Sequence, residues 1–297
     1  AHMQLGKLLE KKGEIDDALI HLKKAVEQDP KLVDLNGTIA RLLASKEQFH
    51  DALPYFKKAM EHQPDDVMKT FEYANTLNTC NYTEQALELY YQLLKKRPND
   101  SGILYNTAYT LKKLGKISEA MPYYEKALQR NPNHAEAHFS LGLAHLMLGN
   151  FKKGWPEYEW RWQRDSQLKP REFKQPMWDG SRGEGKLLFI HCEQGLGDTF
   201  QFIRLVSLAK QQFGGRVIVA VQKPLETIIS RCCPYIDRVI TLDKIPVNFD
   251  YHCPLLSLPL VLDIEEKTIP TNIPYIHPDP TLVEFWRRKL SKDNKFK

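Results

Sequence analysis

Two hydrophobic patterns divide the sequence. Up to about residue 163, apolar residues recur at the three- and four-residue spacing of amphipathic helices, within a larger period of 34 residues. Beyond that point, short continuous apolar runs alternate with helical stretches, as in parallel strands that are covered on both faces. These patterns predict an α-solenoid over residues 1–163, a linker rich in proline, glycine and charge over 164–185, and an α/β domain over 186–297.

The 34-residue period is marked by equally spaced prolines, Pro30, Pro64, Pro98 and Pro132. Each repeat also places a small residue four positions before a bulky one, which suits close packing between helices. The small residues are Ala18, Ala52, Ala86 and Ala120, and the bulky ones are Leu22, Phe56, Tyr90 and Tyr124. These positions resemble the tetratricopeptide repeat (TPR), a pair of antiparallel helices, in four full copies and a modified fifth.

The TPR resemblance implies a superhelix, because each helix pair must stack on its neighbours to bury its apolar face. Its concave groove would be lined by the first helix of each pair and would bind an extended peptide or a partner protein. The positions that face such a groove are Phe71, Asn75, Asn78, Tyr105, Tyr109, Lys112 and Phe139. For each of the aromatic residues among them, the alternative is packing between repeats.

An aromatic segment closes the fifth repeat. Trp155, Tyr158 and Trp162 fall on one face of a helix, and such a stripe is typical of a packing surface. The domain that follows is its expected partner. We therefore interpret residues 151–163 as a brace between the two halves of the chain.

The second half predicts an open α/β sheet. Apolar runs at 187–190, 217–221 and 238–242, with a weaker one at 249–252, indicate strands. Helical stretches near 198–212 and 224–231 separate the first three, which gives a βαβαβ order. Because ligands of such sheets lie beyond the carboxyl ends of the strands, the loop 191–199 is where chemistry is expected.

Glycines shape this loop. Gly195 and Gly197 allow the backbone to approach a ligand closely, and the start of the next helix favours an anion such as phosphate. The dinucleotide fingerprint G-x-G-x-x-G fails, however, because Phe200 stands at the place of the third glycine, which argues against NAD. Asp198, with Gln201 three residues later, is interpreted either as the N-cap of its helix or as a base that accepts a proton late in a displacement.

Six short motifs, taken in order, resemble bacterial TPR glycosyltransferases of the GT-B superfamily, which are similar to heptosyltransferases and to O-GlcNAc transferase. The resemblance extends from about residue 151 to the end. Its motifs are Gly154-Trp155, Glu159-Trp160-Arg161-Trp162, Trp178-Asp179-Gly180, Glu193-Gln194-Gly195-Leu196-Gly197-Asp198, Gln201-Phe202-Ile203-Arg204 and Leu256-Ser257-Leu258-Pro259.

The glycosyltransferase resemblance implies two facing Rossmann-like domains, of which the first holds acceptor and catalytic residues and the second binds a nucleotide sugar. It implies that Asp198 is the catalytic base and that the two loop glycines shape the cleft. Gln201, Arg204 and Ser257 would line the cleft, although Arg204 also suits an ordinary cation on a helix surface. The resemblance implies no cofactor and no metal ion, with the nucleotide sugar as co-substrate.

The end of the sequence bears on activity. The chain ends at 294–297, after a helix expected at about 280–291, where the family would begin its nucleotide-sugar domain. We therefore expect the donor half to be missing and this chain to be inactive alone. The rival interpretation is a non-catalytic adaptor whose repeats bind a partner and whose α/β domain is a structural cap.

Charge and cysteine usage narrow the class of protein. A net charge of +5 is too small and too dispersed for a nucleic-acid-binding surface. The five cysteines lack paired spacing, which favours a reducing cytoplasm over a disulfide framework or a zinc ribbon. Two His-Cys dipeptides, at 191–192 and 252–253, suit zinc in principle, but buried strand ends are the simpler explanation. No apolar run is long enough to span a membrane.

Overall fold

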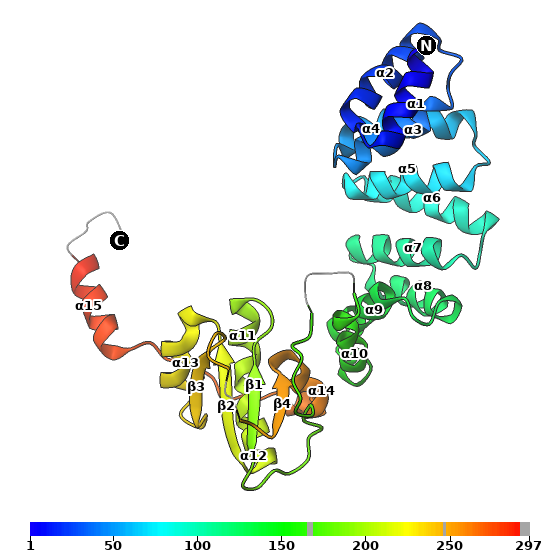
Figure 1. The fold of residues 1–297 in the computed structure, drawn as a ribbon. Helices are drawn as coiled ribbons and strands as arrows, with labels where there is room; N and C mark the ends of the chain where they lie inside the picture. The colour runs from blue at the N-terminus through cyan, green and yellow to red at the C-terminus, as the bar shows by residue number, and fades with distance from the viewer. Residues whose placement is uncertain (165–168, 246–247, 292–297) are drawn as a thin grey trace. The chain divides into compact units, whose positions relative to one another are not determined.

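The computed structural model describes residues 1–164, 169–245 and 248–291, and the chain divides into two units, Ala1–Leu148 and Gly149–Lys297 (Figure 1). The last residues of the sequence, where the resemblance places the start of a further domain, lie outside the described residues.

The first unit consists of antiparallel helix pairs, which confirms the predicted helical solenoid. Helices α1 to α8 form four such pairs, the second helix of each pair packs on the first helix that follows it, and α9 packs on α8. The helices are α1 His2–Lys12, α2 Ile15–Gln28, α3 Leu35–Ser45, α4 Phe49–His62, α5 Val67–Thr79, α6 Thr83–Lys96, α7 Ser101–Lys113, α8 Ile117–Arg130 and α9 Ala135–Met147.

The sequence period explains the packing of these pairs. The four recurrent alanines, Ala18, Ala52, Ala86 and Ala120, have no exposed surface. Their bulky partners are at most 2% exposed, so every repeat contributes the same contact to a continuous core. Turns within the pairs need left-handed backbone, which Gly13 and Gly115 supply at φ of +79° and +77°. Glu47 and Asn81 adopt this conformation in the second and third pairs.

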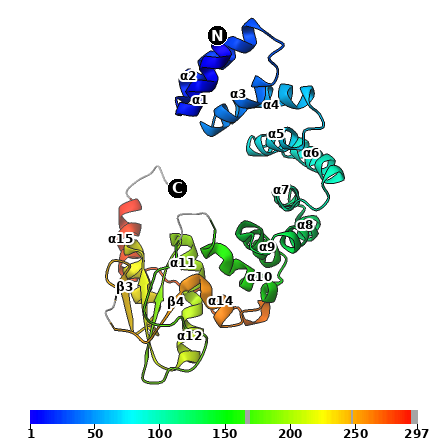
Figure 2. The same ribbon diagram turned by 45° about the vertical axis from the view of Figure 1, so that its right-hand side comes forward.

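The second unit contains a four-stranded parallel sheet in the order β3-β2-β1-β4 (Figure 1), whose outer strands β3 and β4 are labelled again in the turned view of Figure 2. The strands are β1 Leu187–His191, β2 Arg216–Val221, β3 Arg238–Thr241 and β4 Tyr251–Pro254. The helical segments are α10 Phe151–Tyr158, η1 Glu159–Trp162, α11 Leu196–Phe202, η2 Ile203–Leu205, α12 Val206–Phe213, η3 Lys223–Leu225, α13 Glu226–Cys232, η4 Leu255–Ser257, α14 Leu258–Val261, η5 Glu266–Thr268 and α15 Pro280–Leu290.

The strand order creates a switch point beside β1. From β1 the chain continues through β2 to β3 on one side, and β4 is added on the other side. Connections that leave neighbouring strands in opposite directions open a crevice at their carboxyl ends, where ligands of α/β proteins commonly bind. The place expected for a crevice is therefore beyond His191 and Pro254, which are paired in register at the ends of β1 and β4.

The tryptophan-rich segment packs within the second unit. The Trp155 indole donates a hydrogen bond to the carbonyl of Ile264 (2.9 Å), and its ring meets the edge of Phe202. Helix α10 also contacts α14. The expected packing on the α/β part is therefore observed.

The domain boundary is a separate question. The sequence groups residues 151–163 with the repeats and ends the first domain at 163, whereas the structural units divide at 148. The boundary at 163 stays a prediction.

Candidate functional site

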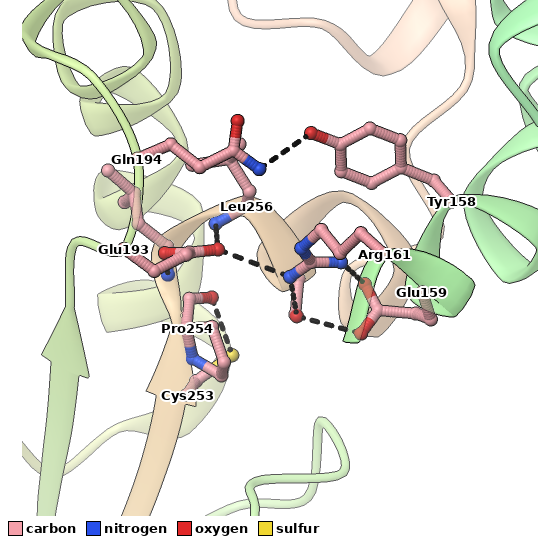
Figure 3. A network of polar contacts seen from close by, with 10 residues as sticks. Tyr158, Glu159, Arg161, Glu193, Gln194, Cys253, Pro254 and Leu256 are labelled. Atoms are coloured by element: carbon pink, nitrogen blue, oxygen red, sulfur yellow. Dashed lines mark hydrogen bonds and ion pairs between the residues drawn. The ribbon is translucent and has the colours of Figure 1, made fainter. Parts of the chain in front are cut away.

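A buried arginine lies at the carboxyl edge of the sheet, where we define the Arg161 cluster as Glu159, Arg161, Glu193 and Ser257 (Figure 3). The Arg161 side chain is 1% exposed. Its guanidinium donates to Glu159 Oε1 (2.5 Å), Glu193 Oε1 (3.1 Å) and Ser257 Oγ (2.7 Å). The Ser257 hydroxyl in turn donates to Glu159 Oε2 (3.0 Å). One cation thus holds two carboxylates and a hydroxyl.

Glu193 joins the two strands that flank the switch point. It follows β1 by two residues, and its carboxylate accepts the backbone N–H groups of Leu255 (3.1 Å) and Leu256 (3.2 Å), directly after β4. Together with the bond from Arg161, these contacts tie η1, the β1 loop and η4 together. The Arg161 cluster therefore occupies the place expected for a crevice between β1 and β4.

Aromatic rings enclose the guanidinium. Arg161 lies over the rings of Tyr158 (5.0 Å) and Trp162 (4.4 Å). The hydroxyl of Tyr158 accepts a hydrogen bond from Gln194 Nε2 (3.1 Å). The aromatic residues that the sequence assigns to a packing surface therefore hold a charge in place, in an arrangement that adds cation–π attraction to the ion pairs.

Burial dominates the electrostatics of Glu193. It raises the pKa of this carboxyl to about 7, although Arg161 and the N–H of Leu256 act in the opposite direction. The folded state therefore binds the Glu193 proton more tightly than the unfolded chain. This tighter proton binding adds to the free energy of unfolding. The contribution is fully present below the ordinary glutamate pKa and is lost as the pH rises through 7.

We expect the pH dependence of the second unit to change in Glu193→Gln. Between pH 5 and pH 8 the free energy of unfolding of the wild type should fall by roughly 1–3 kcal/mol more than that of the variant, given a shift of this size. Denaturant unfolding followed by tryptophan fluorescence at several pH values measures this difference. Parallel pH profiles of the two proteins would contradict the assignment.

Asp198 is the third residue of α11 rather than its N-cap. Gly195 is the N-cap, and its N–H donates to Asp198 Oδ2 (2.9 Å), which is the half of a capping box that a glycine can form. The interpretation of Asp198 as N-cap was therefore wrong by three positions, because Gly195 in extended backbone begins the helix and the carboxylate reaches back to it. The Asp198 side chain stays half-buried, beyond the end of β1. Its role as a base remains a prediction.

The other residues predicted for the cleft differ in placement. Gly197 and Gln201 are exposed. Arg204 is half-buried with its guanidinium 5.1 Å from the Tyr275 ring, and the Tyr275 hydroxyl donates to the carbonyl of Phe200 (2.8 Å). Whether Arg204 lines a cleft or is a cation of the helix surface stays a prediction.

Ser257 is fully buried inside the Arg161 cluster. Its hydroxyl bonds to Arg161 and Glu159, and a role for Ser257 in lining a cleft stays a prediction.

Several predicted groove residues of the first unit are engaged within the repeats. Asn78 is buried and donates to Thr110 Oγ1 (3.0 Å). Asn75 accepts hydrogen bonds from the Tyr90 hydroxyl (2.6 Å) and from Asn106 (3.0 Å).

Phe71 meets the edge of the Tyr90 ring at 6.2 Å. Asn75 and Asn78 therefore bond to α7 of the next pair, whereas the ring contact of Phe71 is to the second helix of its own pair. Packing of Phe71 between repeats stays a prediction.

The remaining groove residues present aromatic and basic surface. Tyr109 is 39% exposed, and the ammonium group of Lys112 lies 5.3 Å from its ring centre. Tyr105 packs on Tyr109 and, at 4.8 Å, on His134. Phe139 in α9 is half-buried. The face of α7 around Tyr109 is thus the part of the predicted groove best suited to contact another molecule.

The two histidines of the His-Cys dipeptides lie side by side. His191 and His252 stack with ring centres 5.7 Å apart. Among the described residues, no group of three histidine, cysteine or acidic side chains is arranged to hold a metal ion. In the same part of the chain, no helix combines the length and the apolar character needed to cross a membrane.

Comparison with known proteins identifies the repeats. Tetratricopeptide repeat models match residues 4–98 and 105–159, about half of the chain. Among solved structures, YrrB, described as a TPR protein with an unusual peptide-binding site, is 19% identical over 54% of this chain and 82% of its own, with a TM-score of 0.48. MamA is 20% identical over 57% of this chain and 96% of its own, with a TM-score of 0.49. No curated protein matches the sequence.

Proposed function

Because the chain is a tetratricopeptide-repeat protein over residues 4–98 and 105–159, we propose that its first unit binds an extended segment of a partner protein. The observation that supports this role is the exposed ring of Tyr109 on α7, a first helix of its pair. Tyrosine contributes large contact area at low entropic cost, so it is a common anchor in interfaces.

Replacing Tyr109 with alanine should weaken peptide binding at least tenfold, the scale of an interface anchor. The measurement is the affinity for a peptide selected from a displayed library against the wild-type protein. Tyr91→Ala is the matched control, because Tyr91 is 37% exposed but lies on α6, a second helix of its pair. Equal losses of affinity in both variants, or no loss in either, would contradict a peptide-binding groove lined by the first helix of each pair.

For the second unit, we propose the acceptor-side half of a GT-B glycosyltransferase. The observation that carries this proposal is Asp198, a half-buried carboxylate beyond the end of β1 in an all-parallel sheet with a switch point beside that strand. The motif resemblance and the position of the loop agree with it, since ligands of such sheets bind at this edge. The activity is transfer of a sugar from a nucleotide donor to an acceptor hydroxyl of a protein or glycan.

In the proposed reaction, the acceptor oxygen forms a bond to the anomeric carbon of the sugar while the bond from that carbon to the nucleotide phosphate breaks. The nucleotide leaves with the bonding electron pair. Asp198 accepts the hydroxyl proton as the new bond forms, when the oxygen has become acidic. The N–H of Gly195 holds one carboxylate oxygen, Oδ2, which leaves Oδ1 to face the acceptor.

A non-catalytic adaptor is the second candidate, and one observation favours it. The Arg161 cluster fills the place expected for a crevice between β1 and β4 with buried side chains of the protein itself. A sheet used only as a structural cap needs no open crevice at its switch point.

The two candidates differ in sugar transfer. The test offers a panel of nucleotide sugars and candidate acceptors to the complete gene product that contains this chain. The glycosyltransferase proposal predicts transfer above background hydrolysis with at least one donor, and the adaptor predicts none with any donor.

A further inference from the structure

A small pocket lies next to the Arg161 cluster at the carboxyl edge of the sheet. It has a volume of about 210 Å³ and is lined by residues of η1, the segment before β1, the loop after β1 and the end of β3. The residues that matter here are Lys169, Arg171, His191, Glu193 and Leu242. A volume of this size accommodates a single acidic group, such as a carboxylate or a phosphate, but not a nucleotide.

His191 is the unusual residue of this pocket. It is the last residue of β1 and is 1% exposed, and neither ring nitrogen has a hydrogen-bond partner among the described residues. Burial, together with the nearby His252 and Arg171, lowers its pKa to about 3, so the imidazole is neutral. A neutral imidazole offers one N–H and one acceptor nitrogen, and leaving both unused in the interior is unfavourable. A ligand in the pocket would supply the missing partner.

The charge of the pocket is positive. Arg171 is half-buried, and its guanidinium makes one long contact, 3.5 Å, to the carbonyl of Leu242. Lys169 is exposed at the rim. Within the described residues neither cation pairs with a carboxylate. The acidic residue of the lining, Glu193, directs its carboxyl group to Arg161 and to the N–H groups after β4.

We propose that this pocket binds an oxyanion, namely the carboxylate or phosphate group of a small ligand. Arg171 is the donor that holds the anionic oxygens, since a guanidinium matches both groups in geometry. Lys169 adds charge at the rim, and His191 donates its ring N–H to one oxygen. The site stands independently of sugar transfer, because it requires only binding.

The test titrates the protein separately with inorganic phosphate and with acetate, by calorimetry and by NMR of the histidine ring nitrogens, at constant ionic strength with chloride as the reference anion. We expect at least one of the two anions to bind with a shift of the His191 ring signals. Arg171→Gln should weaken that binding about tenfold, as expected for loss of a charged hydrogen-bond donor. Binding of phosphate alone assigns the pocket to a phosphate group, and binding of acetate alone assigns it to a carboxylate.

Arg182→Gln is the matched control, because Arg182 is a highly exposed arginine paired with Glu184 on the surface of the same unit. It should bind the anion within about twofold of the wild type, since exposed pairs contribute little. The proposal is overturned if neither anion shifts the His191 signals. It is equally overturned if Arg171→Gln binds as tightly as the control, which would assign any affinity to general surface charge.

Discussion

Replacing Arg161 with alanine should destabilise the second unit by about 3–5 kcal/mol, the usual effect of breaking a buried ion pair from one side. The substitution leaves Glu159 and Glu193 without their shared cation and Ser257 without its donor. It also empties the space between the rings of Tyr158 and Trp162. Loss of charge pairing and loss of packing therefore act together.

This effect can be measured on the second unit alone, even in the full chain. All five tryptophans of the sequence, from Trp155 to Trp286, lie in that unit, so tryptophan fluorescence follows its unfolding. Arg182→Ala is the control and should change the unfolding free energy by no more than about 0.5 kcal/mol, because its ion pair is exposed. If the two variants unfold at the same denaturant concentration, the Arg161 cluster does not stabilise the fold.

A chain shortened to residues 164–297 should lose cooperative unfolding, whereas 149–297 should retain it. The removed segment, 149–163, supplies Arg161 to Glu193 and the Trp155 indole to the carbonyl of Ile264. Its removal also exposes the surface of Phe202 that the indole covers. These losses together approach the whole stability of a small domain, about 5–15 kcal/mol.

Near-ultraviolet circular dichroism and urea unfolding of the two shortened chains measure the difference. Cooperative unfolding with equal midpoints in both would show that the second domain does not need residues 149–163, as the sequence suggests by ending the first domain at 163. Cooperative unfolding of the longer chain only would place the start of the second domain at about residue 149, as the structural units indicate.

The sequence predicts the elements well because their signals are local and repeated. The small residue at position 18, and at the equivalent position of each later repeat, leaves room for a neighbouring helix. Because every repeat needs this close contact, the signal recurs along the chain. The strands around Phe189 and Val219 are continuous apolar runs, since helices and loops cover both faces of the sheet. The helix expected at about 280–291 is likewise observed as α15.

The Arg161 cluster could not be predicted from such signals. Its members come from three segments that are up to 98 residues apart, and pairing over that distance leaves no periodic trace. All of them nevertheless lie in motifs that carry the glycosyltransferase resemblance. The resemblance implies a cleft wall for Ser257, and in the structure its hydroxyl bonds to Glu159 and Arg161.

For the predicted groove of the first unit, too, the sequence does not predict the contacts of single side chains. Position in the repeat identifies which helix face a residue occupies, but it does not tell whether a neighbour engages the side chain. Asn78 reaches Thr110 across 32 residues, whereas Tyr109 keeps 39% of its surface exposed. Both are expected at the groove, and the tertiary contacts alone distinguish them.

The most direct test of the proposed function compares sugar transfer by the complete gene product with that of its Asp198→Asn variant. We expect transfer to fall at least a hundredfold, the usual contribution of a general base, while the tryptophan-detected unfolding midpoint changes little. Asp65→Asn, at an exposed carboxylate of the first unit, should leave the rate unchanged. Transfer by Asp198→Asn at the rate of the Asp65→Asn control would contradict the account.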